Sequence, residues 1–186
     1  MYIVVYKGKF GFIKPWTAVR DGETFSQQFL TPSIVEGIEK KLFPELLQCK
    51  GISKILRHKL TYSSVDMQQE VTQARGWKVT KQQMIRDRSI IKRGIFINPV
   101  LYLAFDSEDD AKRAACQHIC LCRNEDVMLP CSNVMKMSED EFDSLDGFEL
   151  RFCGREQSKF AFLVGYNRFD DAKPMYGWLE YNGIKL

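Results

Sequence analysis

One stretch in the middle of the chain, residues 63–88, has too few aliphatic side chains to form part of a hydrophobic core. It carries basic residues and glutamines instead, around Trp77 and next to Tyr62. A core segment needs more Val, Ile and Leu than this stretch contains. The pattern therefore predicts that residues 63–88 project from the body of the protein.

The charges along the chain point to a partner for this segment. The formal net charge of the 186 residues is only +3, but from Lys50 to Arg93 there are eleven Lys or Arg and three acids. From Asp106 to Glu149 there are four bases and twelve acids. Such asymmetry indicates a polyanionic partner, although two solvated faces that neutralise each other would give the same composition. Cations interleaved with aromatic rings and amides suit single-stranded nucleic acid, because cations contact phosphates and rings stack on bases.

Two β-α-β units flank the projecting segment. Their predicted elements are, in order, a strand at Tyr2–Phe12, a helix from Thr31 to Pro44, strands at Gly51–Tyr62 and Ser89–Phe105, a helix from Ser107 to about His118 and a strand at Leu121–Met128. Further short strands are predicted at Gly147–Phe152, Phe160–Val164 and Gly177–Tyr181, and the acidic segment Ser138–Asp146 is either one helical turn or a loop. This order predicts an α+β, ferredoxin-like antiparallel sheet with two helices. We expect one domain over residues 1–150, with a β-rich extension over residues 151–186.

The first helix has the clearest local signals. Thr31 is a favourable N-cap and Pro32 occupies the first helical position, where its missing N–H costs nothing. Gly37 lies within the apolar stripe of this helix and suggests close packing against another backbone. Ser107 is expected to cap the second helix, whose first turn is acidic.

Six cysteines without an export signal indicate a reducing compartment and free thiols, so we expect a cytoplasmic protein. Cys116, Cys120 and Cys122 lie around His118, but their spacing does not match that of common zinc sites. We therefore expect buried free thiols and neither a metal nor a cofactor. No stretch approaches the roughly 18 uncharged apolar residues of a membrane span. The apolar start of the chain is interpreted as a first strand rather than a signal peptide.

Several motifs resemble a known family. Lys14-Pro15, then Phe29-Leu30-Thr31-Pro32-Ser33 opening a helix that contains Gly37, resemble the fifth Cas subunit of CRISPR Cascade complexes, a member of the RAMP superfamily. Met84–Phe105 and Phe152-Cys153-Gly154-Arg155-Glu156 resemble later segments of that family. The resemblance implies a ferredoxin-like RNA-binding protein with a protruding thumb. It also implies that the chain holds the 5′ handle of the CRISPR RNA and touches the large subunit and the first backbone subunit.

Residues 63–88 stand where the family has its thumb, so the basic and aromatic residues there are the main candidates for RNA contacts. The predicted RNA-binding residues are Lys14, Arg57, Trp77, Lys78, Lys81, Arg86, Arg88, Lys92 and Arg93. Within this set the cations are expected on phosphates, and Trp77 is expected to stack on a base.

Two alternatives stay open at this point. The chain is short for a full member of the family, so it can be a virus-encoded mimic that blocks complex assembly as an anti-CRISPR protein. It can also be a metal-independent endoribonuclease that processes precursor CRISPR RNA, with His58, Lys59 and Tyr62 as weak catalytic candidates. The branch of the family that cuts RNA has a Tyr near the end of its first helix, where this chain has Phe43, which has no hydroxyl. We therefore expect a protein without catalytic activity, with His58 as a surface histidine in a strand that faces phosphates.

Overall fold

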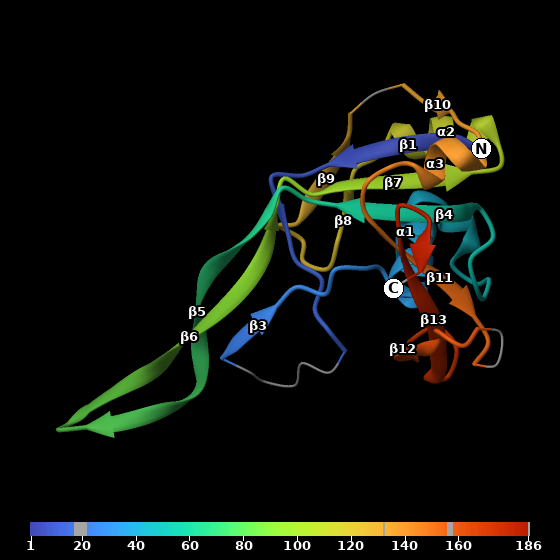
Figure 1. The fold of residues 1–186 in the computed structure, drawn as a ribbon. Helices are drawn as coiled ribbons and strands as arrows, with labels where there is room; N and C mark the ends of the chain where they lie inside the picture. Colours follow the sequence, from blue (N-terminus) through green and yellow to red (C-terminus); the bar gives the residue numbers. More distant parts are fainter. Residues whose placement is uncertain (17–21, 132, 156–157, 186) are drawn as a thin grey trace.

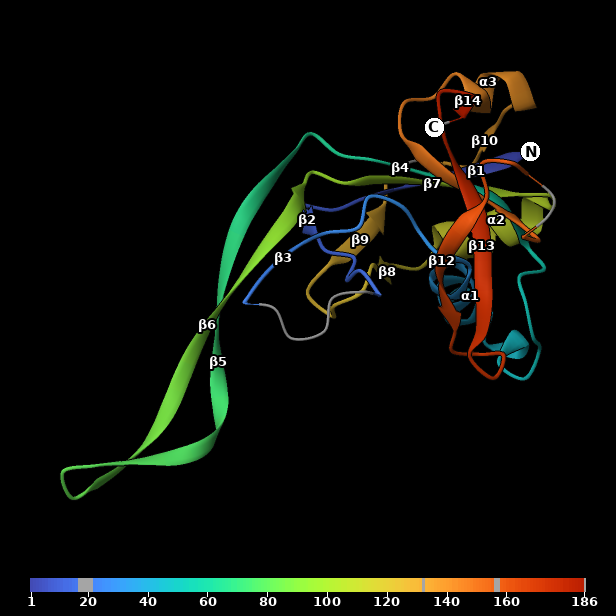
Figure 2. The ribbon, with the colours of Figure 1, turned by 60° about the horizontal axis from the view of Figure 1, so that its bottom comes forward.

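The computed structural model describes residues 1–16, 22–131, 133–155 and 158–185, and within these ranges the side chains of 72–75, 87–88 and 184–185 are not described. Figure 1 shows a body of strands and helices from which a long two-stranded hairpin extends. The same hairpin stands away from the body in a second view (Figure 2). Among the described residues, none of the helices has the length and apolar character needed to cross a membrane.

The helices are short and the strands dominate. The helices are α1 (Pro32–Leu42), the 3-10 helix η1 (Pro44–Leu46), α2 (Glu108–Ala115) and α3 (Glu139–Asp143). The strands of the first half are β1 (Tyr2–Lys7), β2 (Phe10–Gly11), β3 (Glu23–Phe25), β4 (Ile55–Thr61), β5 (Ser64–Thr80), β6 (Gln83–Ile97) and β7 (Val100–Phe105). Those of the second half are β8 (Ile119–Cys120), β9 (Val127–Pro130), β10 (Met135–Lys136), β11 (Phe148–Cys153), β12 (Phe162–Asn167), β13 (Lys173–Tyr181) and β14 (Ile184–Lys185).

The body is built on one large antiparallel sheet. Its strand order is β12-β13-β11-β4-β7-β1-β9-β8, with β10 on β1 and β14 on β13. β7 pairs with β1 along its whole length, from Tyr2↔Phe105 to Lys7↔Val100, and with β4 on its other side. The protein is thus α+β with a mainly antiparallel sheet.

The alternation of side chains along β1 divides the core between the two faces of this sheet. Val4 and Tyr6 pack in the cluster that also holds the buried residues of α1 and α2. Ile3 and Val5 pack on the opposite face with Phe142 of α3. Burial raises the pKa of Tyr6, whose hydroxyl donates to the Ala114 carbonyl of α2 at 2.6 Å. The helices of the two β-α-β units therefore share one face of the sheet, and α3 covers the other.

The projecting segment predicted at 63–88 is a β-hairpin formed by β5 and β6, which extends to Ile97 and is called the arm below. The two strands pair from Ser64↔Ile97 at the body to Thr80↔Gln83 at the far end. A strand as long as β5 spans roughly 50 Å. β2 and β3 pair with β6 only near the body, β3 as far out as Lys92. Beyond that point the arm is two-stranded in the part of the chain that the structure describes.

Ser107 and Ser138 cap their helices with a side-chain hydrogen bond, whereas Thr31 does not. Thr31 has the extended backbone of an N-cap, but its hydroxyl lies 3.2 Å from the Ser33 hydroxyl and accepts no backbone N–H of α1. The Ser107 oxygen accepts the Asp110 N–H, as predicted, although α2 ends at Ala115 rather than near His118. The acidic segment 138–146 contains the helical turn α3, which Ser138 starts with a complete capping box.

Two further local predictions, the strand at Leu121–Met128 and the close backbone packing of Gly37, are wrong. The predicted strand Leu121–Met128 is interrupted, because buried Asp126 accepts both the backbone N–H and the guanidinium of Arg123 and closes a turn. Gly37 does not pack against another backbone. A Cβ there would lie 2.7 Å from Nη2 of Arg168, so its neighbour is a side chain.

The caps predict a difference in stability. Ser138→Ala removes the acceptor of the Glu141 N–H and should lower the free energy of unfolding by about 1 kcal/mol. Thr31→Val keeps the shape of the buried side chain and removes only a hydroxyl that does not cap α1, so its loss should be clearly smaller. Urea denaturation of both variants measures the two losses. Equal losses would contradict this assignment of the caps.

Candidate nucleic-acid interface

The base of the arm is fixed to the body by two arginines. The Arg93 Nε of β6 donates to Glu70 of β5 at 3.3 Å, and the Arg123 guanidinium of the body donates to Glu70 and, at 3.0 Å, to Gln68. Both guanidinium groups lie against the ring of Phe12, at 5.1 and 5.4 Å from its centroid. Cations and an aromatic face attract each other in this geometry. Arg93 therefore anchors the arm.

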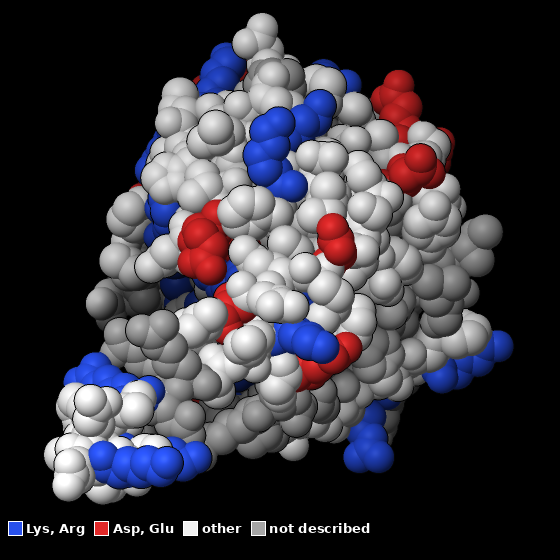
Figure 3. All heavy atoms as spheres, turned by 90° about the vertical axis from the view of Figure 1, so that its left-hand side faces the viewer, with Lys and Arg blue, Asp and Glu red and all other residues white. Residues whose placement is uncertain are grey.

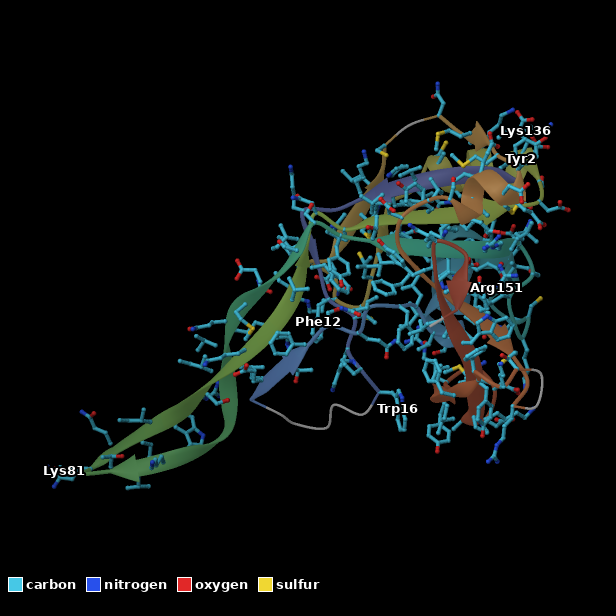
Figure 4. All side chains as sticks on the ribbon, in the orientation of Figure 1. Tyr2, Phe12, Trp16, Lys81, Lys136 and Arg151 are labelled. Atoms are coloured by element: carbon cyan, nitrogen blue, oxygen red, sulfur yellow. The ribbon has the colours of Figure 1, made fainter. Side chains whose placement is uncertain are left out.

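The far end of the arm, residues 77–86, is called the tip below. Trp77 and Arg86 are direct cross-strand partners, and the guanidinium lies 5.1 Å from the centroid of the indole ring, which is 58% exposed. Lys81 and Gln82 form the turn, with φ angles of 40° and 80°. Positive φ at both central residues is typical of two-residue hairpin turns. Figure 4 shows Lys81 at the outermost point of the molecule.

The tip also exposes apolar side chains. Val79, Met84 and Ile85 are all at least half exposed. Val79 and Met84 are cross-strand partners and share one face of the hairpin, whereas Ile85, the partner of Lys78, lies on the other face. A two-stranded hairpin that exposes such side chains is marginally stable in water. Figure 3 shows the arm from its end, with Lys and Arg spheres beside uncharged ones. The tip thus combines cations, a stacking ring and apolar surface.

The predicted RNA-binding residues fall into separate places. Trp77, Lys78, Lys81 and Arg86 come together at the tip. Among the described residues, no carboxylate lies within ion-pair distance of Lys78 or Lys81. Lys92 lies nearer the body, half exposed and 3.9 Å from Glu23.

Two further residues predicted to bind RNA, Lys14 and Arg88, are not among the described side chains of the tip. Lys14 lies on the body, where it lines a small cavity together with Trp16. The side chain of Arg88 is outside the described part of the structure.

Arg57 serves inside the protein, in contrast to its predicted position on RNA. Its Nε and Nη2 both donate to buried Glu149, and Nη2 also donates to Asp143 at 2.6 Å. Burial works against the charge, but these bonds raise the pKa of Arg57. With its side chain only 10% exposed, this cation neutralises the acidic segment rather than a phosphate.

His58, Lys59 and Tyr62, the weak catalytic candidates, do not meet. His58 is 2% exposed, stacks on Phe152 and has no described partner for Nε2, so it is not a surface histidine. Burial, then the charges of Arg151 and Arg57, lower the pKa of His58 to about 3. The Tyr62 hydroxyl accepts from Gln28 at the edge of the body, at 2.8 Å.

Lys59 points to the opposite face of β4 from His58, since neighbours along a strand alternate. Its Nζ is buried and donates to the carbonyls of Phe142, Asp143 and Leu145 at 2.9 to 3.0 Å. Burial lowers the pKa of Lys59. The ammonium therefore holds α3 on the sheet, and the geometry offers no shared surface on which these three groups could act on one phosphate.

The cysteines also differ from the prediction. Cys116 and Cys122 are exposed and Cys120 is half-buried, so they do not serve as the expected buried thiols. In the part of the chain that the structure describes, no group of three or more His, Cys, Asp or Glu is placed to hold a metal ion.

Sequence reasoning missed one further surface on the body. Trp16 and Tyr166 form an edge-to-face pair with centroids 5.6 Å apart, and both rings are about half exposed. In the sequence only Pro15 separates Lys14 from Trp16, and this basic residue beside an aromatic one was the local signal for such a surface. Their partner Tyr166 comes from β12 and could not be assigned without the fold.

Comparisons with known proteins support the fold and give no family. No family profile matches the chain, and no curated protein matches it. A chain of a solved structure described as "CRISPR RNA-guided surveillance complex" matches with a TM-score of 0.52 at 10% identity, over 99% of this chain and 89% of that chain. The protein thus shares its fold with a chain of a CRISPR RNA-guided surveillance complex.

Buried His58 predicts a pH dependence of stability. The folded protein keeps this imidazole neutral down to about pH 3, whereas the unfolded chain protonates it near 6.5. Between pH 3 and pH 6.5 the unfolded state therefore binds one proton more than the folded state. The contribution of neutral His58 to the free energy of unfolding is complete above about pH 6.5 and is lost as the pH falls. Each pH unit below that point should cost about 1.4 kcal/mol.

His58→Gln should remove this part of the acid-side fall between pH 7 and pH 5, measured by urea denaturation. The control is His118→Gln, which replaces an exposed histidine and should keep the wild-type fall. An unchanged slope in His58→Gln would show that His58 is solvated.

Proposed function

We propose that this protein is a non-catalytic subunit that binds the 5′ handle of CRISPR RNA in a Cascade-like surveillance complex. The observation that carries the proposal is the tip, where Trp77, Lys78, Lys81 and Arg86 stand far from the acidic segment. Single-stranded RNA offers unstacked bases to an aromatic ring and phosphates to cations. The shared fold with a chain of a CRISPR RNA-guided surveillance complex supports the same assignment.

We further propose that the centre of the sheet is a ferredoxin-like unit of the RAMP type. The antiparallel order β4-β7-β1-β9, with α1 and α2 packed on one face, is the order expected for two β-α-β units of that plan. The arm joins the end of the first unit to the start of the second, which is where the resemblance expects a thumb. On this view β11 and the strands that follow it extend the same domain.

The proposed protein partners are the large subunit and the first backbone subunit. Exposed Val79, Met84 and Ile85 support a protein contact beside the RNA, because base stacking on Trp77 alone leaves these side chains in water. A subunit that covers the tip would bury them and stabilise the two-stranded part of the arm.

The geometry favours binding over RNA cleavage. His58 and Lys59 are buried on opposite faces of β4, and Lys59 uses its Nζ on three carbonyls. A general base must reach the hydroxyl that it deprotonates, and neither side chain is exposed to a substrate. Incubation of the purified protein with repeat RNA in EDTA should therefore leave the RNA uncut, and cleavage would overturn this part of the proposal.

The tip variant Lys78→Ala/Lys81→Ala/Arg86→Ala should weaken binding of handle RNA. Each phosphate contact with a single strand contributes about 0.7 to the log–log salt slope, so losing all of these should flatten the slope by about 2. Filter binding at several salt concentrations measures both quantities. Unchanged affinity and slope would overturn the proposed role of the tip.

The matched control is Lys112→Ala/Lys136→Ala/Lys159→Ala, which removes the same charge from exposed positions on the body. It should keep the wild-type slope. A protein that captures the other subunits but binds no handle RNA would instead support the anti-CRISPR mimic.

A further inference from the structure

A groove on the body, separate from the arm, has features of a nucleotide site. It consists of two adjoining cavities of about 330 and 160 Å³, and Ile34 and Cys122 line both of them. The larger cavity lies along α1, and the smaller one leads from there to the aromatic pair Trp16–Tyr166. We call this surface the α1 groove.

One end of the α1 groove is cationic. Lys41 of α1 and Arg168, which follows β12, both line the larger cavity, and no Asp or Glu is among its described lining residues. Lys41 uses one of its donors on the His118 carbonyl at 3.0 Å. An ammonium has three donors and a guanidinium five, so donors of both residues are left for an anion.

Gly37 fixes the position of this cationic end. It lies one helical turn before Lys41, and a Cβ at Gly37 would come within 2.7 Å of the Arg168 Nη2. The absence of a side chain therefore lets the guanidinium lie against α1, near Lys41 on the same helical face. Arg168 also stacks on Phe169, with its guanidinium carbon 4.6 Å from the ring centroid.

The other end of the groove is aromatic. Trp16 and Tyr166 are 48% and 50% exposed, so each ring keeps free surface beyond the contact between them. Gly165 has a φ of 142°, and a Cβ on it would lie 3.4 Å from the indole, so the indole packs closely against the backbone there. Lys14 and Ser33 add polar groups at the same end. Figure 4 places Trp16 on the body, away from the tip with Lys81.

We infer that the α1 groove binds one nucleotide, with its base against Trp16 and Tyr166 and its phosphate at Lys41 and Arg168. Aromatic rings stack with any base, and two cations in a cavity that has no Asp or Glu among its described lining residues favour a phosphate. As a second contact for the CRISPR RNA this inference rests on the proposed function, whereas as a nucleotide site it rests on the groove alone. The ligand is a nucleotide unit, either free or within an RNA strand.

The test uses the full chain and three probes, which are 5′-AMP, adenosine and 5′-phosphorylated penta-adenylate, with binding measured by equilibrium dialysis. Lys41→Gln/Arg168→Gln and Trp16→Leu should each weaken binding of 5′-AMP about tenfold, the effect of one good charge-assisted or stacking contact. Adenosine should bind the wild type more weakly than 5′-AMP does. Because adenosine has no phosphate, its affinity should be the same for the wild type and for Lys41→Gln/Arg168→Gln.

Gly37→Ala is the sharpest variant, because it changes no charge and strengthens the helical propensity of α1. Its methyl group takes the place of the Arg168 guanidinium, so phosphate binding should fall while the melting temperature does not. The matched control for Lys41→Gln/Arg168→Gln is Lys112→Gln/Lys136→Gln, which removes as much charge from residues that are not among those lining the groove. Figure 4 shows Lys136 at the opposite side of the body from Trp16. This control should bind like the wild type.

The tip variant of the previous section separates this inference from the proposed function. It should leave binding of 5′-AMP unchanged even if it loses handle RNA. If penta-adenylate binds and depends on the groove residues but 5′-AMP does not bind, the site takes the nucleotide as part of a strand. If neither 5′-AMP nor penta-adenylate binding responds to the groove variants, the inference is overturned.

Discussion

The shape of this protein depends on how a long hairpin is held at one end. Arg93 and Arg123 converge on Glu70, and both lie against Phe12, so the arm is clamped to the body by charge, hydrogen bonds and an aromatic face. Beyond this clamp the arm has no further strand beside it among the described residues. A hairpin of that kind is stable only where something supports it, and the clamp supplies support at the base alone.

The division of the basic residues follows from the clamp. Cations near the body, such as Arg57 and Arg93, pair with carboxylates and stabilise the fold. Lys78 and Lys81 at the tip have no carboxylate within ion-pair distance among the described residues. The basic residues therefore divide into those that neutralise carboxylates of the body and those on the tip, for which binding of RNA is our proposal.

Much of the fold could be predicted from local pattern. The two β-α-β units, Ser107 as a cap and the projection of residues 63–88 depend on periodicity, capping chemistry and the lack of aliphatic residues, which are properties of neighbouring positions. The same pattern placed Trp77, Lys78, Lys81 and Arg86 together on the projecting segment, and their contact with RNA stays a prediction. Glu70, Phe12 and Arg123, which hold the arm, have no such signal, because they meet only through the fold.

The sequence by itself determined the order of the elements, the alternation that gives β1 two buried faces and the cationic, aromatic character of the arm. Only the tertiary structure decided which ionisable groups are buried. His58 is buried against Phe152 of β11, the strand beside β4 in the sheet, and Lys59 is buried under α3. Both elements come from at least eighty residues further along the chain. The environment of a side chain depends on such distant neighbours, and its pKa and its access to a ligand depend on that environment.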